Sequence, residues 1–190
     1  MQHLLNHIQR FVLLNEEEQE ILHSYITCQD ISKKDYLLRQ GQICTANYFI
    51  LQGCIRLYYM NDNGTEQILH FGIDNWWISD YESLEKQIPS EFYLQTVEPT
   101  RVAVLKKCVQ EELFAKIPKM ERYFRMVFQR AYTASQMRIK YIYTFSGEER
   151  YHHFNNAFPG FIQRIPQYML ASYLGFTPEF LSKIRAKKEK

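Results

Sequence analysis

Two short apolar stripes near the end of the chain, separated by a glycine and a proline, constrain its fold most. The stripes recur at helical spacing and consist of Met169, Leu170, Tyr173 and Leu174, then Phe180, Leu181 and Ile184. Gly175 suits a left-handed position at a helix end, Thr177 can cap the next helix, and Pro178 falls at the first helical position, where a missing N–H costs nothing. Residues 164–188 therefore predict two short helices joined by a tight turn.

The second of these predicted helices carries an exposed basic face. Its outward residues are Glu179, Ser182, Lys183, Arg185, Ala186 and Lys187. Residues 164–190 contain six cationic and two acidic side chains, a net charge of +4, whereas the whole chain is only +2. A helix-turn-helix places its second helix in the major groove of DNA, with basic residues near phosphates. The alternative is a helical hairpin with an ordinary lysine-rich end, because these residue types recur in many helical pairs.

Composition narrows the class of protein. With 190 residues, 46% hydrophobic and 15% aromatic, the chain can bury a substantial core. It has no apolar run of about eighteen residues and no signal-peptide pattern, so we expect a cytoplasmic protein without a membrane partner. The four cysteines stand apart without a CxxC pair, so we predict no metal site and mostly buried, reduced thiols, with a redox sensor as the minority alternative.

Catalytic motifs are absent from the sequence. It contains no GxSxG, phosphate-loop or HExxH pattern. The adjacent His152 and His153 would point about 100° apart on a helix and cannot share a small metal site. We therefore predict a non-enzyme with no catalytic residues.

Residues 31–105 have the pattern of a chain of strands and turns. Short segments rich in β-branched and aromatic residues are separated by turn residues, and Asn63-Gly64 between 55–60 and 65–71 predicts a hairpin. A compact β-barrel or jelly-roll closes such strands without long free edges. Before them, Asn15 followed by three glutamates predicts a helix that reaches about Thr27.

After Pro118 the apolar period becomes helical again and predicts one long helix over 119–145. Its stripe consists of Phe124, Val127, Ala131, Ala134, Arg138 and Tyr141. The small alanines at its middle favour close helix pairing, so we interpret the stripe as a homodimer seam with Arg138 as a polar interruption. The alternative is that the stripe packs on the chain's own barrel. Ser146-Gly147 predicts the end of this helix and the start of the last domain.

The order of these parts resembles the Crp/Fnr family of bacterial transcription regulators. The resemblance rests on Gly41-Gln42 after the 36–38 strand, the YFILQG segment 48–53 leading into 55–58, the Asn63-Gly64 hairpin, and ASYLGFTPEFLSKIR at 171–185. It implies an α+β fold with a cyclic-nucleotide-binding-like β-barrel and flanking helices at 1–117. A long dimerisation helix at 118–146 and an all-α helix-turn-helix domain at 147–190, lacking a full wing, would follow.

The resemblance implies a DNA-binding transcription regulator that acts as a homodimer on an inverted repeat. Matching the family motif puts Glu179 and Lys183 at base-reading positions, which favours a G·C pair in each half-site. Phe180 either faces a thymine methyl or turns inward. The expected DNA contacts are Thr177, Glu179, Phe180, Ser182, Lys183, Arg185, Lys187 and Lys188. RNA polymerase is left open as a further partner. The alternative function is a ligand-sensing or protein-interaction module whose helix-turn-helix no longer binds DNA specifically.

The ligand pocket departs from the family pattern. Cyclic-nucleotide binders of this family hold the ribose with a Phe-Gly-Glu turn and the phosphate with an Arg followed by Ser or Thr, whereas here the positions read 76–80 WWISD and Ser90-Glu91. A carboxylate at Glu91 would repel the phosphate, so we expect neither cyclic AMP nor a cofactor. The pocket candidates are Trp77, Ser79, Asp80, Ser90, Glu91 and Phe92. An unknown small-molecule effector, or filling by the chain's own aromatic side chains, stays open.

Overall fold

The computed structural model describes residues 1–187 and divides into two compact units. The first unit contains Met1–Tyr59 and His70–Gln129, and the second contains Met60–Leu69 together with the chain from Arg130 onward. The tip of one β-hairpin thus groups with the C-terminal helices, which the sequence did not indicate. The division that we expected at residues 117 and 146 stays a prediction.

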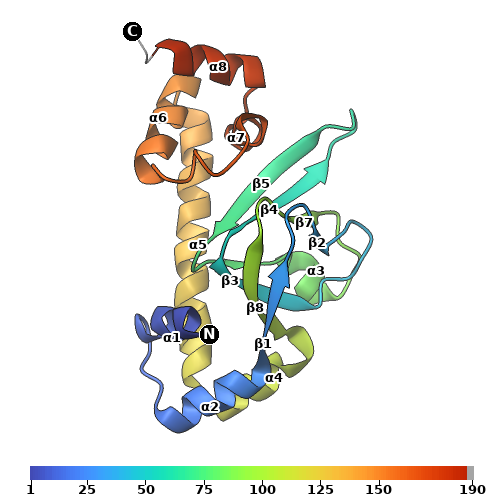
Figure 1. Ribbon diagram of the computed structural model, residues 1–190, viewed down its shortest axis with the longest axis vertical. Coiled ribbons are helices and arrows are strands. Elements are labelled where there is room, and N and C mark those ends of the chain that lie inside the picture. The colour runs from blue at the N-terminus through green and yellow to red at the C-terminus, as the bar shows by residue number, and fades with distance from the viewer. Residues whose placement is uncertain (188–190) are drawn as a thin grey trace. The chain divides into compact units, whose positions relative to one another are not determined.

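Two four-stranded antiparallel sheets form the barrel of the first unit (Figure 1). One sheet has the order β1 (Ile26–Ile31), β8 (Thr100–Lys106), β3 (Ala46–Gln52), β6 (Trp77–Ile78). The other has the order β2 (Tyr36–Leu38), β7 (Tyr93–Thr96), β4 (Cys54–Met60), β5 (Glu66–Ile73). This confirms the expected α+β fold with a jelly-roll-like barrel and the hairpin at 63–64.

Alternation along β3 explains how one strand serves two cores. Ala46, Tyr48 and Ile50 point into the barrel, whereas Phe49 and Leu51 point to a second cluster built with the helices. Because both faces are covered, nearly every residue of β3 is buried. The helices of that second cluster are α1 (Gln2–Gln9), α2 (Glu16–Tyr25), α4 (Lys107–Lys116) and the start of α5 (Lys119–Thr144). Helix α3 (Tyr81–Lys86) instead contributes Leu84 to the barrel interior.

The predicted helix boundaries agree with the structure to within two residues. Asn15 accepts from the Glu18 N–H at 2.8 Å and Glu18 accepts from the Asn15 N–H at 2.8 Å, a reciprocal cap at the start of α2. Helix α5 ends at Thr144, and Ser146 caps α6 (Gly147–Ala157) in the same reciprocal way with Glu149. Within residues 1–187, none of the helices combines the length and apolar character needed to cross a membrane.

Gly53 shows why the β3–β4 connection requires glycine. Its φ is +116°, and a Cβ there would lie 2.5 Å from Thr100 Oγ1 and 2.8 Å from Thr100 Cα. The second of these atoms is backbone and cannot move aside without shifting β8. The tight crossing between the two sheets therefore depends on this residue.

Candidate functional site

The helix-turn-helix predicted from the sequence is formed by α7 (Gln167–Leu174) and α8 (Pro178–Lys187) in the second unit. Gly175 is left-handed, with φ +76°, and the Phe176 N–H donates to the Ala171 carbonyl at 2.8 Å, which closes the end of α7. The Thr177 Oγ1 accepts from the Phe180 N–H at 3.2 Å, and Pro178 is the first residue of α8. Each backbone role that the sequence assigned to this turn is confirmed.

One face of α8 is buried and the other is open. Leu181 and Ile184 are buried, whereas Glu179, Ser182 and Lys183 are exposed. Hydrogen bonds from its own backbone N–H and from the Thr177 hydroxyl lower the pKa of Glu179 below its ordinary value. The open face therefore presents an acceptor, a hydroxyl and a cation in adjacent positions.

The remaining residues expected to contact DNA lie elsewhere on α8. Arg185 is half-buried, and Lys187 Nζ forms an ion pair with Glu148 of α6 at 3.1 Å. The Phe180 side chain is 44% exposed, and its ring meets Phe176 edge-on with the centroids 5.2 Å apart. Lys188 lies outside the described residues, so its predicted phosphate contact has no structural counterpart here.

The tip of the β4–β5 hairpin is hydrogen-bonded to α7 within the second unit. Ser172 Oγ accepts from the Ile68 N–H at 3.0 Å and donates to the Glu66 carbonyl at 2.9 Å, and Gln67 Nε2 donates to the Ser172 carbonyl at 2.7 Å. Because β5 is the last strand of its sheet, these contacts satisfy backbone groups of an edge strand. The sequence carried no signal for this contact, since its two partners are about a hundred residues apart.

Arg138 extends this contact to α5. Its guanidinium donates to the Leu69 carbonyl and, at 2.9 Å, to the Tyr173 carbonyl, and it lies 4.1 Å from the centre of the Tyr173 ring. The role of Arg138 in a dimer seam stays a prediction, and the structure adds a role within the chain. Arg138 joins three segments of its own unit, because a guanidinium has enough donors to serve two carbonyls at once.

The rest of the predicted seam is also largely occupied by its own chain. Phe124 is buried and Val127 packs against the same helix-side cluster. The Tyr141 ring lies 4.4 Å from His153 of α6, centre to centre. Only Ala131 and Ala134, among the six predicted residues, are exposed. The other four residues contact neighbours in their own chain.

A different stripe of α5 is open. It consists of Phe128, Tyr132, Ser135, Ile139 and Ile142, which are all exposed. These residues recur at steps of three and four, and the stripe is offset by roughly 100° around the helix from the predicted one. An open apolar stripe of this kind suits pairing with another helix.

The turn before α3 carries a buried polar cluster at the predicted ligand position. The Asp80 carboxylate, in a residue only 4% exposed, accepts from the Glu82 and Ser83 N–H groups at 3.1 and 3.2 Å and from the Ser90 hydroxyl at 2.6 Å. Ser79 donates to the Ala46 carbonyl at 2.9 Å. Three of the six candidates, Ser79, Asp80 and Ser90, are therefore buried and already hydrogen-bonded within the chain.

The other three candidates point elsewhere. Trp77 faces the helix-side cluster and donates to the Tyr123 hydroxyl at 2.8 Å, because alternation along β6 turns Ile78, not Trp77, into the barrel. Glu91 is exposed, and Phe92 is half-buried with its ring edge toward Tyr59. The rings of Trp77 and Phe92 thus pack on separate neighbours of the same chain.

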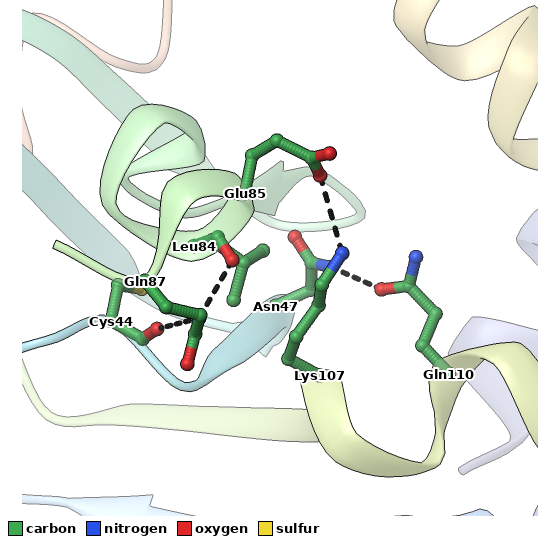
Figure 2. Close-up of polar contacts among 7 residues, drawn as sticks. All are labelled: Cys44, Asn47, Leu84, Glu85, Gln87, Lys107 and Gln110. Carbon is green, nitrogen blue, oxygen red and sulfur yellow. Dashed lines mark hydrogen bonds and ion pairs between the residues drawn. The ribbon is translucent and has the colours of Figure 1, made fainter.

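Hydrogen bonds also close the loop after α3 against the start of β3. Gln87 Nε2 donates to the Leu84 carbonyl at 2.7 Å and to the Cys44 carbonyl at 3.2 Å (Figure 2). Close by, Lys107 pairs with Glu85 at 3.2 Å, and Asn47 Nδ2 donates to Gln110 at 3.0 Å (Figure 2). This network fixes α3 and the Asp80 turn to the sheet.

The cysteines are divided between surface and interior. Cys44 and Cys54 are buried, whereas Cys28 and Cys108 are exposed, so the expectation of mostly buried thiols is corrected for two of the four. In the described part of the chain, no three His, Cys, Asp or Glu side chains gather closely enough to hold a metal ion.

Comparisons with known proteins agree with this architecture. Residues 28–116 match the family of cyclic nucleotide-binding domains. The anaerobic regulatory protein of Haemophilus influenzae is 24% identical over 189 residues, which cover 93% of this chain and 73% of that protein. Among solved structures, CLP, the c-di-GMP responsive global regulator of Xanthomonas campestris, aligns with a TM-score of 0.75 at 12% identity, over 92% of each chain. A Crp/Fnr regulator of Eubacterium rectale aligns with a TM-score of 0.69 at 15% identity, over 93% and 84% of the two chains.

Proposed function

We propose that the chain is a transcription regulator of the Crp/Fnr type that binds duplex DNA specifically, as a homodimer, without a cyclic nucleotide. The open face of α8 supports DNA binding most directly. Glu179, Ser182 and Lys183 follow the cap of a helix-turn-helix second helix, where base edges are read. We further propose that the protein is regulatory rather than catalytic.

The chemistry of this face favours a G·C pair in each half-site. A carboxylate accepts from cytosine N4, and an ammonium donates to guanine O6 or N7. Glu179 is an exposed carboxylate, which is ionised at neutral pH and can accept hydrogen bonds there. Lys183 has no ion pair within the described residues, which leaves its charge for a base edge or a phosphate.

The open stripe of α5 supports a second copy of the chain as the dimer partner. Pairing of α5 with its counterpart would bury Phe128, Ile139 and Ile142, which are large apolar side chains exposed in the single chain. Two recognition helices related by a twofold axis read half-sites roughly 34 Å apart on an inverted repeat. An inverted-repeat operator is therefore part of the proposal.

The Asp80 cluster supports a barrel that does not bind cyclic AMP. The two N–H groups and the hydroxyl that an anion would need at this turn already serve the Asp80 carboxylate. The only cation in residues 79–97 is Lys86, which pairs with Glu82 at 2.6 Å. Calorimetric titration of the purified protein should show no binding of cyclic AMP at micromolar concentration, and clear binding would contradict this part of the proposal.

Selection of duplexes from a random pool at about 150 mM salt tests DNA binding, because non-specific binding is weak at that ionic strength. We expect the wild-type protein to enrich an inverted repeat and Lys183→Ala to relax one position in each half-site. Lys33→Ala removes an exposed lysine from the barrel unit and serves as the matched charge control. Enrichment of no sequence would favour the alternative of a protein-interaction module.

A further inference from the structure

Phe180 on α8 packs over Gly147, the first residue of α6. A Cβ at Gly147 would lie 2.5 Å from Phe180 Cε1, 2.9 Å from its Cζ and 3.2 Å from Phe176 Cε1. Real Cβ atoms essentially never approach other atoms that closely. The Phe180 ring therefore occupies the space that any side chain at position 147 would need.

The two partners of this contact are each held in place. The Phe180 ring meets Phe176 edge-on, and Phe176 lies 4.7 Å beneath the Arg150 guanidinium, which donates to the Leu174 carbonyl at 3.1 Å. On the other side, the reciprocal cap between Ser146 and Glu149 fixes the start of α6, where Gly147 stands. The contact joins two helix starts that are both fixed by local hydrogen bonds.

A second contact lies on the same side of α8. Lys187, seven residues after Phe180 and so on the same helix face, pairs with Glu148 next to Gly147. Both ends of α8 are thereby tied to the first turn of α6. Glu179, Ser182 and Lys183 stay exposed beside these attachments, and Lys183 lies three residues after Phe180 and four before Lys187 on the helix.

We propose that Phe180 is a positioning residue that wedges α8 against Gly147 and sets the angle at which Glu179, Ser182 and Lys183 meet DNA. The inference rests on the proposed DNA-binding function. It assigns no base contact to Phe180 and makes Gly147 a requirement for the angle of the recognition helix. A ring of fixed orientation suits this role, because it packs with defined geometry and few rotamers.

The wedge itself is tested without DNA, by thermal unfolding of Gly147→Ala, Phe180→Ala and the double variant in the full chain. We expect Gly147→Ala to lower the Tm by roughly 4–8 °C in the wild-type background, since overpacking strains a fixed site. In the Phe180→Ala background the same change should lower the Tm much less, because the two closest contacts are gone and only the 3.2 Å approach to Phe176 remains. An equal drop in Tm from Gly147→Ala in both backgrounds would contradict the proposed packing of Phe180 against Gly147.

The role in DNA recognition is tested by duplex selection and titration with Phe180→Ala and Phe180→Leu. For Phe180→Ala we expect about tenfold weaker binding with unchanged base preference at every position, and for Phe180→Leu partial recovery of affinity. Lys183→Ala, which should relax a single position, is the matched comparison. Loss of preference at one position in Phe180→Ala would identify a base reader and overturn the proposal. If the wild type selects no sequence, the DNA-binding function fails, whereas the unfolding measurements still decide whether the wedge exists.

Discussion

Ile139 gives the sharpest test of the proposed homodimer. It lies within the open stripe of α5 and is 55% exposed in the single chain. In a pairing of two α5 helices through this stripe, each copy would bury the exposed part of its Ile139 side chain. Replacing Ile139 by alanine removes most of that area while keeping helix propensity high.

The expected effect follows from the exposed fraction. Full burial of an isoleucine side chain stabilises by about 1.5–3 kcal/mol, so roughly half of this, about 1–1.5 kcal/mol, is available at each copy. Because both chains of a twofold dimer carry the substitution, the total loss of association free energy is about 2–3 kcal/mol. At 1.4 kcal/mol for each factor of ten, Ile139→Ala should weaken the dimer Kd by roughly 30–140-fold.

Sedimentation velocity over a range of protein concentrations measures this change directly. Met137→Ala is the matched control, since Met137 is 37% exposed but lies about 200° away from Ile139 around the helix. We expect the control to keep the wild-type Kd. An unchanged Kd for Ile139→Ala, or an equal loss for Met137→Ala, would refute pairing through this stripe.

Three further predictions concern single residues of the two units. Burial, and secondarily the nearby Cys44 thiol, raises the pKa of Tyr48 from its ordinary 10.0 to about 12. The unfolded chain therefore ionises first, and the contribution of Tyr48 to the free energy of unfolding should fall by about 2–3 kcal/mol between pH 10 and pH 12. Urea titrations of Tyr48→Phe should show a loss smaller by that amount than in the wild type, while buried Tyr123 and Tyr173, whose pKa values are also raised, keep their own share. Asp80→Ala removes the cap of α3 and leaves the buried Ser90 hydroxyl with only the longer bond to the Phe92 carbonyl at 3.3 Å, so urea unfolding should show a loss of about 2–4 kcal/mol, and Ser90→Ala should cost less in this background than in the wild type. Arg138→Ala should speed amide hydrogen exchange at 66–69 and at the end of α7 while leaving α1 protected, and unchanged exchange at both places would contradict the role given to its two carbonyl contacts.

The helix-turn-helix could be predicted closely because each of its boundaries depends on local chemistry. A left-handed glycine, a hydroxyl cap and a proline at the first position act within four residues of one another, as Gly175, Thr177 and Pro178 do. The helix starts at Asn15 and Ser146 could be placed from the sequence for the same reason, because each depends on residues close together in the chain. Contacts between distant segments, such as Ser172 with β5, leave no such local trace.

Periodicity predicted the long helix but not which side of it is covered. A stripe of apolar residues shows that a face of α5 is buried without showing what buries it. Phe124 packs with Trp77 of the barrel, with the ring centres 5.0 Å apart, and so belongs to the chain's own core. The open stripe begins with the next turn at Phe128, which is 39% exposed although its ring still contacts Tyr81 and Phe124.

The Asp80 turn shows how the family fold can persist while the chemistry of its pocket changes. The sequence revealed that the Arg-Ser pair was missing, but an absent arginine alone leaves open donors that another anion could use. In the structure those donors are used already: two N–H groups and the Ser90 hydroxyl converge on a carboxylate that belongs to the chain. An intramolecular carboxylate competes at a high effective concentration, so an incoming phosphate would have to displace it and uncap α3. Under the proposed function, we therefore expect a signal to reach the barrel through another surface or through a ligand that leaves this cap intact.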